Sequence, residues 1–169
     1  MNEYKIIKDE KIMNSNIDKK RCFWPGDDPL MITYHDKEWG VPVHDDRKLF
    51  EFMVLDTFQA GLSWAIVLKK REGFRKAFDN FQPEIIAVYD ETKIGELIQN
   101  PAIIRNKLKI RTTVTNAQTF LNIRKEYGSF DRFIWQFTEG KTIVNHWKTE
   151  KEIPSHSTES NSMSAELKK

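Results

Sequence analysis

Apolar residues recur at helical spacing through most of the chain. In the stretch 47–61, RKLFEFMVLDTFQAG, the residues near helical spacing are Leu49, Phe50, Phe52, Met53 and Phe58. Asp45 or Asp46 can cap the start of a helix, and Gly61 can end one. The pattern therefore predicts a helix here, with Asp56 near its end. No run of alternating apolar and polar residues indicates a strand, so we expect an all-α fold.

Two shorter helical segments follow. The segment 62–78, LSWAIVLKKREGFRKAF, offers Ser63 as a cap, and we expect Gly73 to interrupt the helix because glycine disfavours a helix interior. The segment 83–89, PEIIAVY, begins with Pro83, which is favoured in the first turn.

The stretch 91–128 predicts a helix, a break at Asn100 and Pro101, and a longer helix that Gly128 ends. The apolar positions of that second part keep the period: Ile103, Leu108, Ile110, Val114, Ala117 and Leu121. Two helices joined by a tight turn beside cations are typical of a helix-hairpin-helix. Ser129 then caps a further predicted helix, FDRFIWQF.

The two ends of the chain differ from its middle. Residues 1–20 form a polar extension without the apolar core of a signal peptide, and we expect residues 21–169 to form one domain. The tail 148–169 is rich in Ser, Thr and charge, which is typical of a linker. Its last six residues, SAELKK, resemble the first turn and a half of a helix.

Composition narrows the class of protein. A chain of 169 residues that is 39% hydrophobic and 12% aromatic can bury one sizeable core. No apolar run approaches the about eighteen residues of a membrane span, so we expect a cytoplasmic protein. The net charge of +2 does not by itself indicate nucleic-acid binding, yet 69–76 and 105–111 are basic. Each is either a binding patch or a solvated helix face.

The single cysteine excludes an internal disulfide. Cys22 is therefore a buried small hydrophobe, a reactive thiol or a metal ligand.

Large aromatic residues gather around one carboxylate in the stretch 24–64. They are Trp24, Tyr34, Trp39, Phe58 and Trp64, and the polar members are Asp56 and Gln59. An aromatic-walled pocket with a carboxylate suits a flat, cationic heterocycle such as a modified nucleobase, because ring faces attract positive charge and carboxylates accept N–H groups. The alternative is that these aromatics belong to the core.

Two long motifs carry a family resemblance: YHDKEWG at 34–40 and QAGLSW at 59–64. With them, the chain resembles the DNA-3-methyladenine glycosylase I family of the helix-hairpin-helix glycosylases, and the likeness continues through IIRNKLKI and FIWQF. The resemblance implies a compact helical bundle with a helix-hairpin-helix element. It also implies a base-excision repair enzyme that flips 3-methyladenine out of alkylated DNA and hydrolyses its bond to deoxyribose.

The resemblance assigns the base site. It implies that Trp24, Tyr34 and Trp64 line the base pocket, and that Asp56, where the family has a glutamate, hydrogen-bonds the base with Gln59 beside it. The catalytic set is then Asp56, Tyr34 and Trp64. Methylation at N3 makes the adenine cationic, so the base leaves as a neutral molecule and needs little acid–base help.

The resemblance also assigns partners. The hairpin residues expected to contact DNA phosphates are Arg105, Asn106, Lys107 and Lys109. The partners are double-stranded DNA with alkylated adenine and the free base as product. We expect a monomer that has no membrane partner.

Cys22 and His35 match two of the four ligands of a structural zinc in the family. The family's other two ligands follow the lysine pair that matches Lys168 and Lys169, where this sequence stops. We therefore expect half of the zinc site. Two alternatives to the active enzyme follow: a truncated, catalytically weak or inactive homologue that binds DNA or the base, and an incomplete gene product.

The half-site predicts that the 169-residue chain holds no stoichiometric zinc, because zinc in structural sites takes four ligands. Elemental analysis of the purified chain, with titration of the Cys22 thiol, checks this. One tightly held zinc per chain would contradict it and would indicate another ligand, such as His44, or a dimer that shares two half-sites.

Overall fold

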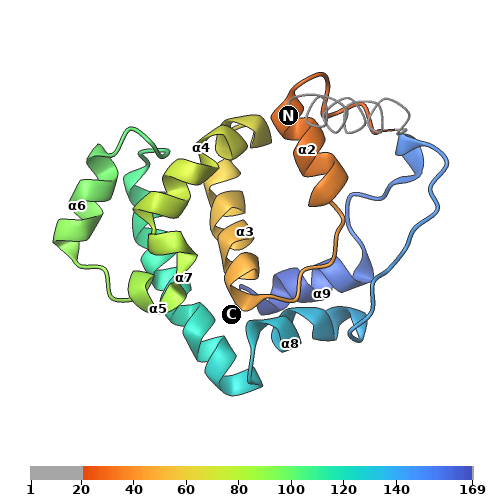
Figure 1. The fold of residues 1–169 in the computed structure, drawn as a ribbon. Helices are drawn as coiled ribbons and strands as arrows, with labels where there is room; N and C mark the ends of the chain where they lie inside the picture. Colours follow the sequence, from red (N-terminus) through yellow and green to blue (C-terminus); the bar gives the residue numbers. More distant parts are fainter. Residues whose placement is uncertain (1–20, 169) are drawn as a thin grey trace, which may run out of the picture. The chain divides into compact units, whose positions relative to one another are not determined.

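The structure, a computed structural model, describes residues 21–168, and every regular element in that range is a helix (Figure 1). This confirms the all-α fold. The described residues form two compact units, which divide between Val41 and Pro42. The expected extension 1–20 lies outside the described residues, and the single domain 21–169 stays a prediction.

The first unit contains α2 (Pro29–Lys37). The helices of the second unit are α3 (Asp46–Gln59), α4 (Trp64–Ala77), α5 (Pro83–Ile86), α6 (Glu91–Gln99), α7 (Lys107–Tyr127), α8 (Phe130–Trp135) and α9 (Thr158–Glu166). Short 3-10 turns are η1 (Asp79–Phe81), η2 (Gln136–Thr138) and η3 (Glu150–Glu152). Within residues 21–168, no helix has the length and apolar character that a membrane crossing requires.

Local capping signals set the helix boundaries as predicted. The side chains of Asp45, Ser63 and Ser129 accept backbone N–H groups at the starts of α3, α4 and α8. Pro83 occupies the first turn of α5. Gly128 ends α7 in the left-handed conformation, with φ 85°. These predictions are confirmed.

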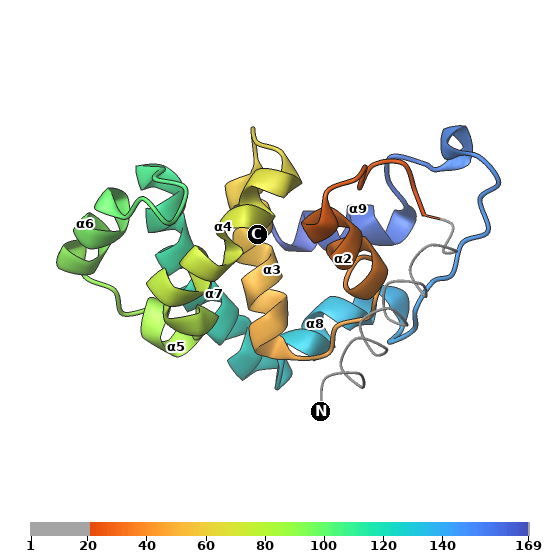
Figure 2. The ribbon, with the colours of Figure 1, turned by 45° about the horizontal axis from the view of Figure 1, so that its top comes forward.

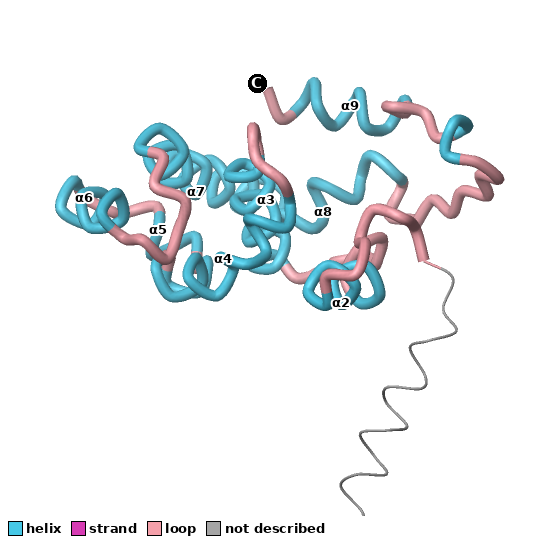
Figure 3. The backbone as a smooth tube through the Cα atoms, turned by 90° about the horizontal axis from the view of Figure 1, so that it is seen from above, coloured by secondary structure: helices cyan, strands magenta, loops and turns pink. Residues whose placement is uncertain are grey.

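Phenylalanine dominates the core of the second unit. The fully buried rings are Phe50, Phe58, Phe74, Phe78, Phe81 and Phe120. The Phe58 and Phe74 ring centroids lie 4.7 Å apart, which joins α3 to α4. In all three views α5 and α6 lie on one side of α3, and α8 and α9 lie on the other (Figures 1, 2 and 3). Each buried Phe side chain contributes about 1.5–3 kcal/mol, so this core fixes the position of α3.

Polar contacts hold α3 along its length. Near its middle, the buried Glu51 carboxylate accepts from Arg71 Nε at 2.6 Å and pairs with Arg75 at 2.7 Å, which ties α3 to α4. At its start, the Asp46 carboxylate accepts the backbone N–H groups of Phe130 and Asp131, at 3.1 and 2.8 Å. Asp46 therefore caps α8, which fastens the first turn of α3 to that helix.

The predicted interruption at Gly73 is wrong. Helix α4 runs through Gly73 to Ala77, and a Cβ at Gly73 would lie 2.3 Å from the carbonyl oxygen of Ala102. Glycine is present because the turn between α6 and α7 packs directly against α4. The predicted break at Asn100 and Pro101 is confirmed, since α6 ends at Gln99.

Two further expectations need correction. Leu108 is not a core position: its side chain is 74% exposed, and Ile103 is buried in the turn before α7. The segment SAELKK is not the start of a helix, because α9 begins at Thr158 and ends at Glu166. The start is set by a capping box in which Ser157 and Ser160 exchange side-chain and backbone hydrogen bonds.

Gly73→Ala should destabilise the protein by about 1–3 kcal/mol, because the added Cβ would collide with a backbone carbonyl. Gly95→Ala is the matched control, since Gly95 lies inside α6 with nothing within 4 Å of the added atom. It should stabilise by about 0.5–1 kcal/mol. Urea denaturation of the three proteins checks this. If Gly73→Ala were as stable as the wild type or more stable, the turn between α6 and α7 would not pack directly against α4.

Candidate functional site

The first unit contains an aromatic cluster built on α2. Asp28 caps this helix and Pro29 starts it, so that Tyr34 and His35 fall in its last turns. The Trp24 ring lies 6.2 Å from Tyr34 and 5.2 Å from His35, measured between centroids. Trp39 completes the cluster at 5.3 Å from Trp24. Two predicted base-binding residues, Trp24 and Tyr34, are therefore neighbours.

The two predicted zinc ligands also lie together. The backbone N–H of Cys22 donates to His35 Nε2 at 3.4 Å, and the Asp36 carboxylate lies 3.0 Å from Nδ1 of the same ring. Arg21 binds Asp36 in turn, at 2.7 Å. In the described part of the chain, no group of three or more His, Cys, Asp or Glu side chains is arranged to hold a metal. These residues do not by themselves form a four-ligand zinc site, and the zinc half-site stays a prediction.

In the second unit, Asp56, Gln59 and Trp64 lie where the chain turns from the end of α3 into the start of α4, and we call this turn the corner. Asp56 and Gln59 lie three residues apart near the end of α3, so they share a face of that helix. At Gly61 the backbone enters the left-handed region, with φ 82°, and Trp64 begins α4. Phe58, a member of the predicted aromatic group, is fully buried and belongs to the core.

The Asp56 carboxylate has an unusual environment. Asp56 as a whole residue is exposed to solvent. Desolvation by the surrounding protein nevertheless raises the pKa of its carboxyl group above the ordinary value. A carboxylate that has lost part of its hydration gains more from a cationic partner than a fully hydrated one. Asp56 thus combines access to a ligand with a preference for positive charge.

Lys109 stabilises this corner through hydrogen bonds to its backbone. Its ammonium group donates to the carbonyl oxygens of Phe58, at 3.1 Å, and Ala60, at 2.6 Å. Lys109 lies in the first turn of α7, where the Asn106 side chain accepts its backbone N–H at 3.1 Å. The turn that precedes α7 therefore lies next to the end of α3.

The predicted DNA-binding residues consequently differ in their surroundings. Arg105 and Lys107 are exposed. The Asn106 side chain caps α7, and the Lys109 ammonium is hydrogen-bonded to backbone carbonyls at the end of α3. Sequence reasoning missed this internal role of Lys109. No local pattern marks it, because the bonded residues lie 51 and 49 positions away.

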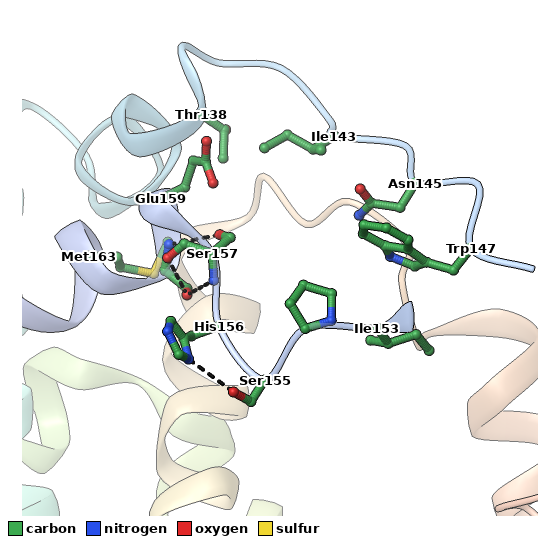
Figure 4. Close-up of a pocket in the computed structure, with 12 residues that line it drawn as sticks. Thr138, Ile143, Asn145, Trp147, Ile153, Ser155, His156, Ser157, Glu159 and Met163 are labelled. Atoms are coloured by element: carbon green, nitrogen blue, oxygen red, sulfur yellow. Dashed lines mark hydrogen bonds between the residues drawn. The ribbon is translucent and has the colours of Figure 1, made fainter. Parts of the chain in front are cut away.

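A separate open pocket lies beside the start of α9 (Figure 4). Trp147, Ile153 and His156 are among its lining residues. His156 Nδ1 lies 2.9 Å from the Ser155 hydroxyl. None of the predicted site residues lines this pocket.

Solved structures share this fold. One of 3-methyladenine DNA glycosylase I matches with a TM-score of 0.84 and 42% identity, over 88% of this chain and 82% of the other. A structure from Staphylococcus aureus, described as showing how that enzyme recognises 3-methyladenine, matches with a TM-score of 0.83 and 33% identity. It covers 88% of this chain and 79% of the other. The architecture is thus that of the helical 3-methyladenine glycosylases.

The sequence comparisons agree. The family described as methyladenine glycosylase matches residues 24–169. DNA-3-methyladenine glycosylase 1 of Escherichia coli (strain K12) is 42% identical over 150 residues, which are 89% of this chain and 80% of that protein. The chain therefore belongs to the methyladenine glycosylase family.

The raised pKa of Asp56 predicts a dependence of stability on pH. The folded state binds more protons than the unfolded state, so ionisation of Asp56 lowers the free energy of unfolding as the pH rises. Asp56→Asn should therefore be at least as stable as the wild type at pH 7. The difference should vanish below pH about 3, where the wild-type carboxyl is neutral in both states. Urea denaturation at both pH values checks this, and a less stable variant at pH 7 would contradict it.

Proposed function

We propose that this protein is a DNA-repair glycosylase that releases 3-methyladenine from alkylated DNA by hydrolysis of the N-glycosidic bond. Family membership and the named activity of the Escherichia coli relative support this function. The single observation that carries it is the solvent-accessible carboxylate of Asp56 at the corner where α4 begins with Trp64.

The site suits a cationic base. The carboxylate of Asp56 attracts the positive ring and accepts N–H groups from its edge. Gln59, on the same helix face, supplies a second polar group, and Trp64 offers a ring face on which the base stacks. Trp24 and Tyr34 are proposed as further walls, and for these two the support is the resemblance of their motifs to the family.

The reaction follows from the charge of the substrate. Water replaces the base at the deoxyribose carbon and gives up one proton to the solvent, and the electron pair of the breaking bond neutralises the methylated ring. The base therefore leaves as a neutral molecule and needs no proton from an acid. Asp56, Tyr34 and Trp64 act by holding the flipped base, so that selection occurs through binding.

DNA contacts are proposed for the turn before α7. Arg105 and Lys107 are exposed there and carry positive charge. Contacts to phosphates fix the position of the protein on the duplex without reading its sequence. We also propose that the protein acts as a monomer and in the cytoplasm.

Release of the free base tests the function directly. Duplex DNA treated with a methylating agent is incubated with the protein, and the liberated bases are separated by chromatography. We expect 3-methyladenine above the amount released without protein. Retention of DNA with no release would support the alternative of a non-catalytic binding homologue, and loss of both would support an inactive product.

Asp56→Asn should weaken the binding of free 3-methyladenine about ten- to a hundredfold, because a hydrogen bond to a charged group contributes roughly 1.5–3 kcal/mol. Asp56→Glu keeps the carboxylate and should bind at least as tightly as the wild type. Calorimetric titration of the free base into the three proteins measures this. Equal affinities across the set would remove Asp56 from the base site.

A further inference from the structure

We propose that Lys109 is a positioning residue, whose ammonium group fixes the end of α3 and thereby the direction of Asp56 and Gln59. This inference rests on the proposed function for its effect on the base. It assigns Lys109 to the support of the base site and leaves the phosphate contacts to Arg105 and Lys107.

The end of α3 needs an external partner. The last carbonyl groups of a helix have no intrahelical donor. Here the chain leaves the helix at once, since Ala60 has a non-helical backbone, with φ −48° and ψ 116°, and Gly61 is left-handed. The Leu62 N–H satisfies the Gln59 carbonyl, at 2.6 Å. Lys109 satisfies the Phe58 and Ala60 carbonyls on either side of it.

The charge of Lys109 also suits this place. The carbonyl end of a helix carries partial negative charge, which a cation in the last turn stabilises. An ammonium group has three N–H donors, and two of them are used on these carbonyls. Lys109 is half-buried, whereas its neighbours Lys107 and Leu108 are exposed.

Lys109 is itself held firmly. Asn106 accepts its backbone N–H at 3.1 Å, and its carbonyl accepts the hydroxyl of the buried Thr113 at 2.8 Å. Both ends of the link are therefore fixed, one in the first turn of α7 and the other in the last turn of α3. Lys109 thus connects the turn that carries Arg105 and Lys107 to the helix end that carries the base-reading groups.

A purely structural role makes a different prediction. If Lys109 only added stability, a folded variant would bind the base as the wild type does. If Lys109 contacted phosphate, its removal would change the salt dependence of DNA binding. If Lys109 positions the base site, its removal should weaken base binding and leave the salt dependence of DNA binding unchanged.

Three variants separate these roles: Lys109→Met, which removes the donors, Lys109→Arg, which keeps them, and Lys107→Met as the control. Each is titrated with free 3-methyladenine and with undamaged duplex DNA over a range of salt. For Lys109→Met we expect base affinity at least about tenfold lower and an unchanged salt slope. Lys107→Met should keep its base affinity and lose about 0.9 from the slope. Lys109→Arg should restore base binding to within about threefold of the wild type.

Wild-type base affinity in folded Lys109→Met, or a salt slope reduced as in Lys107→Met, would overturn the proposal. Amide hydrogen exchange at Leu62 gives a readout that needs no ligand, and we expect it to be faster in Lys109→Met and normal in Lys107→Met. If the wild type failed to bind the base, the proposed function would fall, and unchanged exchange at Leu62 in Lys109→Met would still overturn the claim that Lys109 fixes the end of α3. If Lys109→Met did not fold, Lys109→Gln would take its place in both measurements.

Discussion

The end of α3 is the constraint on which the candidate site depends. A helix that stops and reverses within a few residues exposes carbonyl groups that need donors, and this chain supplies them from the start of α7 through Lys109. A second contact joins the turn before α7 to α4, because Gly73 has no side chain and the Ala102 carbonyl packs directly against it. The two contacts fix the turn between α6 and α7 against the pair formed by α3 and α4.

This arrangement explains how a partly desolvated carboxylate can persist on the surface. Partial burial of the Asp56 carboxylate disfavours its charged form and raises its pKa. The same helix is held by the buried phenylalanine core and by the Glu51 pairs with Arg71 and Arg75. The stability of α3 thus comes from the core and from these ion pairs and not from Asp56, which leaves the Asp56 carboxylate available for a ligand.

The sequence predicted what depends on nearest neighbours along the chain. The caps at Asp45 and Ser63 and the helix end at Gly128 involve groups a few residues apart, and all three are confirmed. Contacts distant in sequence were missed. Local sequence marks Gly73 as a helix breaker, because its contact with Ala102, 29 positions away, leaves no local signal. The same limit concealed the internal hydrogen bonds of Lys109.

For the site, sequence alone supplied the residue types and the structure supplied their surroundings. The group containing Asp56 and Trp64 was chosen for its chemistry, and the fold places both around one corner. Phe58, from the same group, is fully buried in the core. The helical period of apolar residues cannot distinguish an aromatic ring that faces a ligand from one that faces the core. Both kinds of ring lie on partly buried faces of a helix.

We propose that the corner joining α3 to α4 binds the methylated base. NMR spectra of the labelled protein, titrated with free 3-methyladenine, test it most directly, because each tryptophan indole N–H gives its own signal. We expect the signals of the Trp64 indole and of the Asp56 and Gln59 backbone amides to shift, and those of the Trp135 and Trp147 indoles to stay in place. Shifts confined to Trp147 and His156, or no shift at Trp64, would contradict it.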